Sequence, residues 1–242
     1  MSTPASFDEV LSPFPPRDPV SEVDHRVEEL VRDRLAERFP GHDIIGEELD
    51  EHRGTSRDIV WVIDPIDGTK SFITGRPLFG TLIALAHAGR PVLGVIDQAI
   101  LRERWVGMAG EASFHNGRPI GVRPCPRLED AVLLTTSPDL FEGPERLGFA
   151  RLHERVRLTL YGGDCYAYGQ LAMGLVDLVV ETGLAAYDFM ALAPVIEGAG
   201  GRLTDWRGGS LTLDSAGDVV ASGDPRTAAA AQALLQPHAA TA

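Results

Sequence analysis

The sequence is poor in cysteine and has no long apolar run. Two cysteines among 242 residues are too few for a disulfide scaffold, and no Cys/His cluster has the spacing of a zinc site. The sequence contains no run of 18 apolar residues, which is about the length needed to cross a bilayer. The N-terminal residues also lack the basic start and apolar core of a signal peptide. We therefore expect a cytoplasmic protein.

Positive charge is also scarce. The chain has 22 Lys and Arg against 35 Asp and Glu, a formal net charge of -13, and Lys70 is its single lysine. A chain this acidic repels nucleic-acid phosphates and anionic lipids. We expect neither a polynucleotide nor a membrane as partner, and a phosphorylated ligand would need a local source of positive charge.

Several common catalytic motifs are missing. The sequence contains no G-x-S-x-G elbow, no P-loop and no complete G-x-G-x-x-G fingerprint. The seven histidines are scattered singly, and neither Cys125 nor Cys165 has a base or an anion-binding motif beside it. We interpret both cysteines as ordinary buried thiols.

The chain divides into three parts by pattern. Prolines interrupt residues 1–19, which we interpret as an extended tail or covering arm. Apolar residues at steps of three and four predict a helix from Ser21 to Pro40, and strand-like runs between Leu78 and Ile120 predict an antiparallel meander. After the meander the pattern alternates between strands and helices, which is typical of α/β layers. We predict a lead-in over 1–19, an N-terminal α+β half over 20–127 and a C-terminal α/β half over 128–242.

The elements expected in the C-terminal half are short. Strands are predicted at 132–134, 178–180, 202–204 and 219–221, and helices at 144–153, 168–174, 189–198 and 227–235.

The segment from Val60 to Phe72 is the most informative part of the sequence. An apolar strand ends at Asp64, Pro65 fixes the backbone, and Asp67 follows three residues later. Two carboxylates turned toward one point repel each other unless a cation lies between them, and oxygen ligands favour Mg²⁺ or Mn²⁺. Gly68 and Thr69 would allow a phosphate to approach the backbone. The alternative is that both aspartates are ordinary turn residues.

Three further acidic positions have similar alternatives. Glu47 could supply a third carboxylate or orient a water, although acidic runs are usually solvated. Asp188 could be the N-cap of the helix that follows it, and Asp24 could complete a capping box with Ser21.

Together these segments resemble the inositol monophosphatase superfamily of Mg²⁺-dependent phosphomonoesterases. The shared motifs are Gly46-Glu47-Glu48, Trp61–Thr69, Tyr187-Asp188 and Glu197–Gly201. Within the superfamily the chain is most similar to histidinol-phosphate phosphatases. That similarity lies in Asp67–Leu82, Leu93–Gln98 with Arg102–Trp105, and Gly163–Tyr168.

The resemblance implies a role for each matching residue. The implied metal ligands, for two or three Mg²⁺ ions with Mn²⁺ as a substitute, are Glu47, Asp64, Asp67, Asp188 and the carbonyl of Ile66. Thr69 and Asp24 would position the attacking water, with Glu47 sharing that role. Gly68 and Thr69 would contact the phosphate, and Asp164 and Glu181 would contact the rest of the substrate. Exposed or capping acids are the alternative for these last two.

The resemblance also implies a fold and a reaction. The fold is a layered αβαβα sandwich, commonly a homodimer, and the reaction is hydrolysis of L-histidinol phosphate to L-histidinol and phosphate in histidine biosynthesis. The ions would lower the pKa of a water and stabilise the leaving oxygen. An inositol 1-phosphate or 3′-phosphoadenosine 5′-phosphate phosphatase is one alternative. The other is a catalytically silent regulatory module that binds a metal or ligand.

Overall fold

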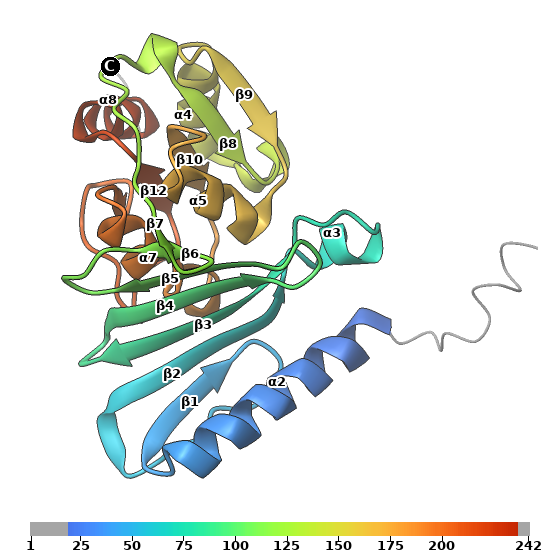
Figure 1. Ribbon diagram of the computed structural model, residues 1–242. Helices are drawn as coiled ribbons and strands as arrows, with labels where there is room; N and C mark the ends of the chain where they lie inside the picture. The colour runs from blue at the N-terminus through green and yellow to red at the C-terminus, as the bar shows by residue number, and fades with distance from the viewer. Residues whose placement is uncertain (1–18, 237–242) are drawn as a thin grey trace, which may run out of the picture.

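Two β-sheets and the helices around them form five layers (Figure 1). The computed structural model of the protein describes residues 19–236. Helix α2 lies outside the seven-stranded sheet, α5 and α7 lie between the two sheets, and α4 and α8 lie outside the five-stranded sheet. This order confirms the predicted αβαβα sandwich. Within residues 19–236 no helix has both the length and the apolar character needed to span a bilayer.

The seven-stranded sheet runs in chain order from β1 to β7. Its strands are antiparallel except for the parallel pair β1 and β2. The predicted meander is therefore present. The elements of this part are α2 (Pro19–Arg38), β1 (His42–Gly46), β2 (Ser56–Asp67), α3 (Thr69–Ile73), β3 (Gly80–His87), β4 (Arg90–Gln98), β5 (Glu103–Met108), β6 (Phe114–His115) and β7 (Arg118–Pro119).

The five-stranded sheet has the order β11-β12-β10-β8-β9. Strands β8, β9 and β10 are parallel, whereas β12 is antiparallel to both β10 and β11. The elements of this part are the 3-10 turns η1 (Leu128–Asp130) and η2 (Pro138–Leu140), β8 (Val132–Thr135), α4 (Gly143–His153), β9 (Leu158–Tyr161), α5 (Asp164–Ala172), β10 (Leu178–Glu181), α6 (Ala186–Phe189), α7 (Leu192–Gly198), β11 (Arg202–Thr204), β12 (Val219–Ser222) and α8 (Pro225–Leu235).

Two of the predicted helices differ from the structure by more than two residues at one end. The helix expected at 189–198 is split into α6 and α7, because Pro194 lacks an N–H and is accommodated in the first turn of the new helix α7. The helix expected at 168–174 begins earlier, at Asp164. The edge strand β9 was not predicted, and its side chains are mostly exposed.

Side chains of the first sheet alternate between two apolar layers. Leu82 and Ala84 point into the main core, between the sheets, whereas Ile83 and Leu85 lie on the opposite face. Ile44, Trp61 and Ile63 are buried on that opposite face, where Val31 and Leu35 of α2 pack on them.

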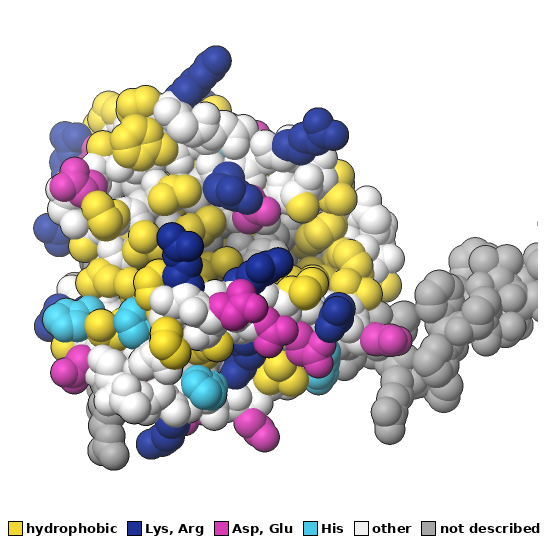
Figure 2. All heavy atoms as spheres, turned by 60° about the horizontal axis from the view of Figure 1, so that its bottom comes forward, with side chains coloured by type: hydrophobic (Ala, Val, Ile, Leu, Met, Phe, Trp, Pro, Cys, Tyr) yellow, Lys and Arg dark blue, Asp and Glu magenta, His cyan; other side chains and the backbone are white. Residues whose placement is uncertain are grey.

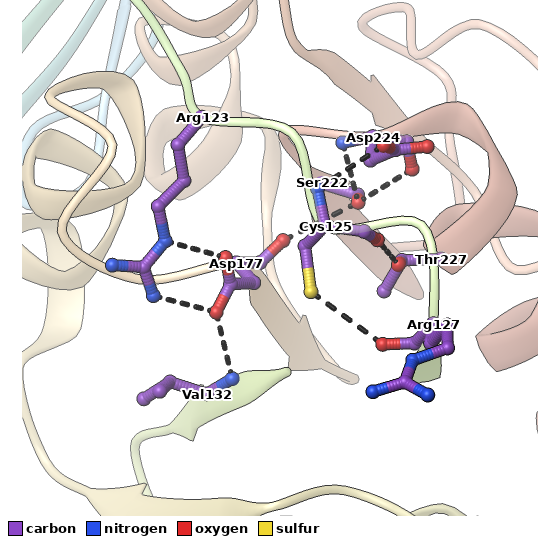
Figure 3. Close-up of polar contacts among 8 residues, drawn as sticks. All are labelled: Arg123, Cys125, Arg127, Val132, Asp177, Ser222, Asp224 and Thr227. Carbon is purple, nitrogen blue, oxygen red and sulfur yellow. Dashed lines mark hydrogen bonds and ion pairs between the residues drawn. The ribbon is translucent and has the colours of Figure 1, made fainter. Parts of the chain in front are cut away.

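A polar network joins the segment between the sheets to the second sheet (Figure 3). Arg123 donates two hydrogen bonds of 2.7 Å to the buried carboxylate of Asp177, which also accepts the N–H of Val132 at 2.8 Å. Asp224 accepts the N–H of Cys125 at 3.1 Å. These bonds hold residues 123–125, which follow the first sheet, against strands of the second.

Candidate active site

Three aspartates converge where the end of β2 meets α6. Asp64 and Asp67 belong to β2, and Asp188 belongs to α6. One carboxylate oxygen from each lies within 4.8 Å of the others. The pairing of β2 with β3 is irregular between Asp64 and Asp67, so that the strand turns both side chains toward the same point. The structure therefore brings together three of the four predicted carboxylate ligands.

The electrostatics of this cluster fit a cation. Burial, and then the charges of neighbouring carboxylates, raise the pKa of Asp64 and of Asp67 well above the usual aspartate range. Asp64 is 1% exposed, and its Oδ1 has no hydrogen-bond partner among the described residues. Buried carboxylates without donors are costly to keep ionised, and a hard divalent cation would supply the missing charge. The donor set thus suits a metal ion held by oxygen ligands.

Glu47 lies directly after β1 and interacts with this cluster. Partial burial is the main cause that raises the pKa of its carboxyl group, and the charge of Asp188 adds to the effect. A hydrogen bond with the Asp64 side chain acts in the opposite direction. Glu47 is not one of the three carboxylates that lie within 4.8 Å of each other. Glu47 interacts with the cluster from an exposed position, whereas Asp64 is buried.

The loop that carries Glu47 is fixed by Glu28 of α2. The fully buried Glu28 carboxylate accepts the N–H of Glu48 at 2.8 Å and the N–H of Leu49 at 3.3 Å. Arg32 donates to the same carboxylate at 2.7 Å and also to the carbonyls of Leu49 and Asp50. A Cβ at Gly46 would lie 2.0 Å from Glu28 Oε1, so this close approach requires glycine.

Asp24 is buried one helical turn before Glu28, on the same face of α2. The capping box with Ser21 is wrong, because the helix already begins at Pro19 and Asp24 lies in its second turn. Asp188 is not the N-cap of the helix that follows it, because it lies inside α6, whose N-cap is Ala185. Its Oδ2 accepts the N–H of Ala185 at 2.7 Å, and the side chain also belongs to the aspartate cluster.

The turn after Asp67 has the shape expected for a close backbone approach. Gly68 has φ 89°, and a Cβ there would lie 2.8 Å from the Asp164 carboxylate. Thr69 begins α3, and its hydroxyl donates to the carbonyl of Ile66 at 3.2 Å. Gly68, Thr69 and Ile66 therefore all lie at the end of β2, next to Asp67.

Asp164 joins the two halves of the site. Its carboxylate accepts hydrogen bonds from Ser71 at 3.1 Å and from Thr136 at 3.4 Å. Burial raises the pKa of Asp164, whereas these two hydrogen bonds and the charges of Arg76 and Lys70 act to lower it. The single lysine of the chain therefore lies near the site.

Glu181 lines a cavity of about 90 Å³ that two aspartates of the cluster, Asp67 and Asp188, also line. Asp164 lines the same cavity. Glu181 is 3% exposed, and burial raises the pKa of its carboxyl group. The Glu181 carboxylate accepts the N–H of Thr136 at 3.0 Å and the hydroxyl of Tyr168 at 2.8 Å. The exposed-acid alternative for Glu181 is therefore wrong.

Sequence reasoning missed the residues that support the site. These residues are Glu28, Arg32, Ser71, Thr136 and Tyr168. A signal was available for the first two, since Asp24, Glu28 and Arg32 follow one another at steps of four on one helix face. Ser71 and Thr136 lie far from Asp164 in the sequence, and no local pattern links them to it.

Comparison with known proteins agrees with this geometry. A model of the inositol monophosphatase family matches residues 9–239. The chain is 51% identical over 205 residues to the bifunctional phosphatase IMPL2, chloroplastic, of Arabidopsis thaliana; the match covers 84% of this chain but only 59% of that protein. It is 37% identical over 216 residues to the histidinol-phosphatase of Chlorobaculum parvum, covering 88% of this chain and 83% of that enzyme.

Solved structures show the same fold. An inositol monophosphatase from Zymomonas mobilis superposes with a TM-score of 0.86 and is 45% identical in sequence, over 92% of this chain and 86% of that one. The family match spans the whole described structure and includes every carboxylate of the site. The chain belongs to the inositol monophosphatase family and is a phosphatase of that family.

Proposed function

We propose that this protein hydrolyses L-histidinol phosphate to L-histidinol and phosphate with Mg²⁺, as a step in histidine biosynthesis. The observation that supports the proposal is the cavity that aspartates of the cluster line together with Asp164 and Glu181. Asp67 and Asp188 belong to the aspartate cluster, whereas Glu181 lies on β10 of the second sheet. The substrate has a phosphate at one end and an ammonium group at the other. The phosphate would be bound to the aspartate cluster through metal ions, and the ammonium group would face carboxylates directly.

Asp64, Asp67, Asp188 and Glu47, with the carbonyl of Ile66, would hold two or three Mg²⁺ ions, or Mn²⁺ in their place. Bound there, the ions would supply positive charge to the phosphate and make a water more acidic. This resolves the charge problem of an acidic protein with an anionic substrate.

The side chains of the protein would orient the reactants. Glu47 would accept a proton from the attacking water at a carboxylate oxygen, and Thr69 and Asp24 would orient that water. As the water oxygen bonds to phosphorus, the bond from phosphorus to the substrate oxygen breaks, and the departing oxygen takes a proton from solvent. Positioning and charge, rather than a covalent intermediate, account for the rate in this proposal.

In the same cavity, Asp164 and Glu181 would bind the organic part of the substrate. Both carboxylates are largely buried, which strengthens their attraction for a cation. A cationic amino alcohol with an imidazole suits this acidic wall better than a neutral polyol does.

The main alternative is hydrolysis of inositol 1-phosphate or of a nucleotide such as 3′-phosphoadenosine 5′-phosphate. The similarity to an inositol monophosphatase at 45% identity supports it. Phosphate release from the three substrates, measured with and without Mg²⁺, tests the proposal. We expect the highest kcat/KM for histidinol phosphate; a preference for either other substrate would contradict the assignment.

The silent regulatory module is the second alternative. It predicts no metal-dependent phosphate release from any of the three substrates, even when metal binds. A small-molecule phosphomonoester as ligand and a homodimer as assembly remain predictions alongside the function.

A further inference from the structure

The beginning of helix α5 presents several groups to the site. Asp164 and Tyr168 line the cavity, and the N–H of Cys165 donates to Oδ2 of Asp67. The hydroxyl of Tyr168 also donates to the Glu181 carboxylate at 2.8 Å. The rotation of α5 about its own axis therefore decides where both carboxylates of the acidic wall, Asp164 and Glu181, are held, and whether Asp67 receives its hydrogen bond.

The chain enters α5 through an unfavourable backbone conformation. Gly162 and Gly163 have φ values of 84° and 117°, and Asp164 follows with φ 43°. The left-handed region suits glycine but is disfavoured for a residue with a Cβ, such as Asp164. Such a conformation persists only where surrounding contacts hold it in place. Contacts on the side of α5 away from the cavity are therefore needed.

Tyr166 supplies such a contact. A helix turns by about 100° per residue, so Tyr166 points away from the side of α5 that carries Asp164 and Tyr168. The Tyr166 hydroxyl donates to Oε2 of Glu103, in β5, at 2.7 Å. Burial and this hydrogen bond raise the pKa of Tyr166 to about 12, so the hydroxyl keeps its proton and remains a donor at neutral pH.

Glu103 is held toward α5 by a second partner. Charged side chains of both signs protrude over much of the surface seen in Figure 2. The Glu103 side chain, in contrast, is only 21% exposed, and its Oε1 lies 3.3 Å from Nε2 of His115. Both carboxylate oxygens of Glu103 thus have a neighbour, and the carboxylate has a fixed direction.

Trp105 packs between the same elements. Its ring stacks on His115 with centroids 4.7 Å apart and meets the Tyr166 ring edge-on at 5.5 Å. A Cβ at Gly169 would lie 2.8 Å from the Trp105 ring, so the backbone of α5 rests directly on the indole. Strand β5 therefore contacts α5 through one hydrogen bond and one aromatic ring.

We propose that Glu103 is a positioning residue for the acidic wall of the cavity. By accepting the Tyr166 hydroxyl it fixes the rotation of α5, and with it the direction of Asp164 and of the Cys165 N–H. Glu103 and Tyr166 lie in two segments that resemble histidinol-phosphate phosphatases, Arg102–Trp105 and Gly163–Tyr168, and their contact gives those segments a shared role. The effect on substrate rests on the proposed function, whereas the effect on Cys165 does not.

Kinetics of two variants test the effect on substrate. Tyr166→Phe removes only the hydroxyl, and Glu103→Ala removes its acceptor. Each should lower kcat/KM for histidinol phosphate about tenfold, mainly through KM, and should lower it less for p-nitrophenyl phosphate, which has no cationic group. Glu103→Gln should restore most of the activity, because the amide oxygen can accept the same bond. Equal losses on both substrates would overturn the proposal.

Matched controls separate positioning from a general loss of surface groups. Tyr161→Phe removes a hydroxyl from a side chain that is 46% exposed. Glu129→Ala removes a carboxylate from an exposed ion pair with Arg155. Both controls should keep the kinetics of the wild type.

A double-mutant cycle tests whether Glu103 acts through Asp164. In the Asp164→Asn background, Glu103→Ala should change KM for histidinol phosphate much less than it does in the wild type, because the wall that it positions is already altered. Additive losses would show that Glu103 acts by another route and would overturn the proposal.

An NMR measurement tests the positioning without any substrate. The chain has two cysteines, so labelling with ¹⁵N-cysteine gives backbone signals from Cys125 and Cys165 alone. In Tyr166→Phe and Glu103→Ala the Cys165 signal should shift, because its bond to Asp67 changes, whereas the Cys125 signal should stay and show that the fold persists. Tyr166→Phe decides alone if Glu103→Ala does not fold. An unchanged Cys165 signal would overturn the proposal. A wild type that prefers another phosphate ester would contradict the proposed function only.

Discussion

The carboxylate of Glu28 accepts the backbone N–H of Glu48 at 2.8 Å, which ties helix α2 to the residue after Glu47. Glu28 and Arg32 do not belong to the aspartate cluster and are not proposed metal ligands. Together they fix the loop that carries Glu47, which is a proposed metal ligand. Residues that orient metal ligands in this way typically change metal affinity by about 10–100-fold when they are substituted.

Glu28→Gln should therefore weaken metal binding by about 10–100-fold and lower the rate at subsaturating metal. The amide retains one acceptor but loses the charge that faces Arg32. Isothermal titration with Mn²⁺, together with the metal dependence of phosphate release, checks this. Glu29→Gln is the control, because Glu29 is exposed and pairs with Arg26. Equal metal affinity in both variants would show that Glu28 has no positioning role.

Asp67→Asn should reduce kcat/KM by at least about 10²-fold, the size expected when a key electrostatic group of an active site is removed. The fold should persist, because the substitution relieves repulsion among buried carboxylates. Phosphate-release assays with Mg²⁺ and circular dichroism measure the two effects. Wild-type turnover in this variant would refute the assignment of Asp67.

Glu181→Gln should weaken the binding of histidinol phosphate more than that of p-nitrophenyl phosphate, which has no cationic group. The amide oxygen can still accept one of the bonds from Thr136 or Tyr168, so the wall should remain in place. Measuring KM and kcat of the wild type and the variant with both substrates checks this prediction. Equal losses on the two substrates would indicate a structural role for Glu181.

The metal-free protein should lose stability as the pH rises from acidic values. The pKa of an aspartate in the unfolded chain is about 3.9. Burial raises the pKa of both Asp64 and Asp67 in the folded protein well above that value. The folded state then binds these protons more tightly, so the stability is fully present below the unfolded pKa and is lost as pH rises through the folded values.

Melting temperatures measured in EDTA across this pH range check the prediction. Asp67→Asn should have a shallower decline, and adding Mg²⁺ or Mn²⁺ should reduce the decline in the wild type. A wild-type protein whose Tm in EDTA has the same pH dependence as that of the variant would contradict it.

Asp177→Ala should lower the free energy of unfolding by about 2–3 kcal/mol, because it leaves the N–H of Val132 buried without its acceptor. For a chain of this size that corresponds to a fall in Tm of roughly 4–12 °C. Thermal denaturation of the wild type and the variant measures this change in Tm. Asp130→Ala is the control, since the Asp130–Arg127 pair is exposed and should matter little.

Much of the fold could be predicted because its signals are local. The steps of three and four in α2 and the strand runs of the meander each depend on a few neighbouring residues. Asp64 and Asp67 could be predicted because they lie together in an unusual turn. Asp188 was assigned through the resemblance, since nothing in the local sequence separates a helix cap from a metal ligand. In the structure Asp188 accepts a backbone N–H at the start of α6 and also lies in the aspartate cluster.

What sequence reasoning missed depends on distant contacts. Thr136 meets Asp164 and Glu181 only because β8 and β10 are neighbours in a sheet whose order does not follow the chain. The supporting hydroxyl of Tyr168 comes from a helix that also packs against the first sheet. Such partners follow from topology, which local patterns do not fix.

The walls of the cavity come from both sheets, with Asp67 on one and Glu181 on the other. The Arg123–Asp177 network anchors the segment that connects those sheets. The distance between Asp67 and Glu181 is therefore set by the relative position of the two sheets. We expect a phosphate ester that bridges the two carboxylates to be selected by its length as well as by its charge.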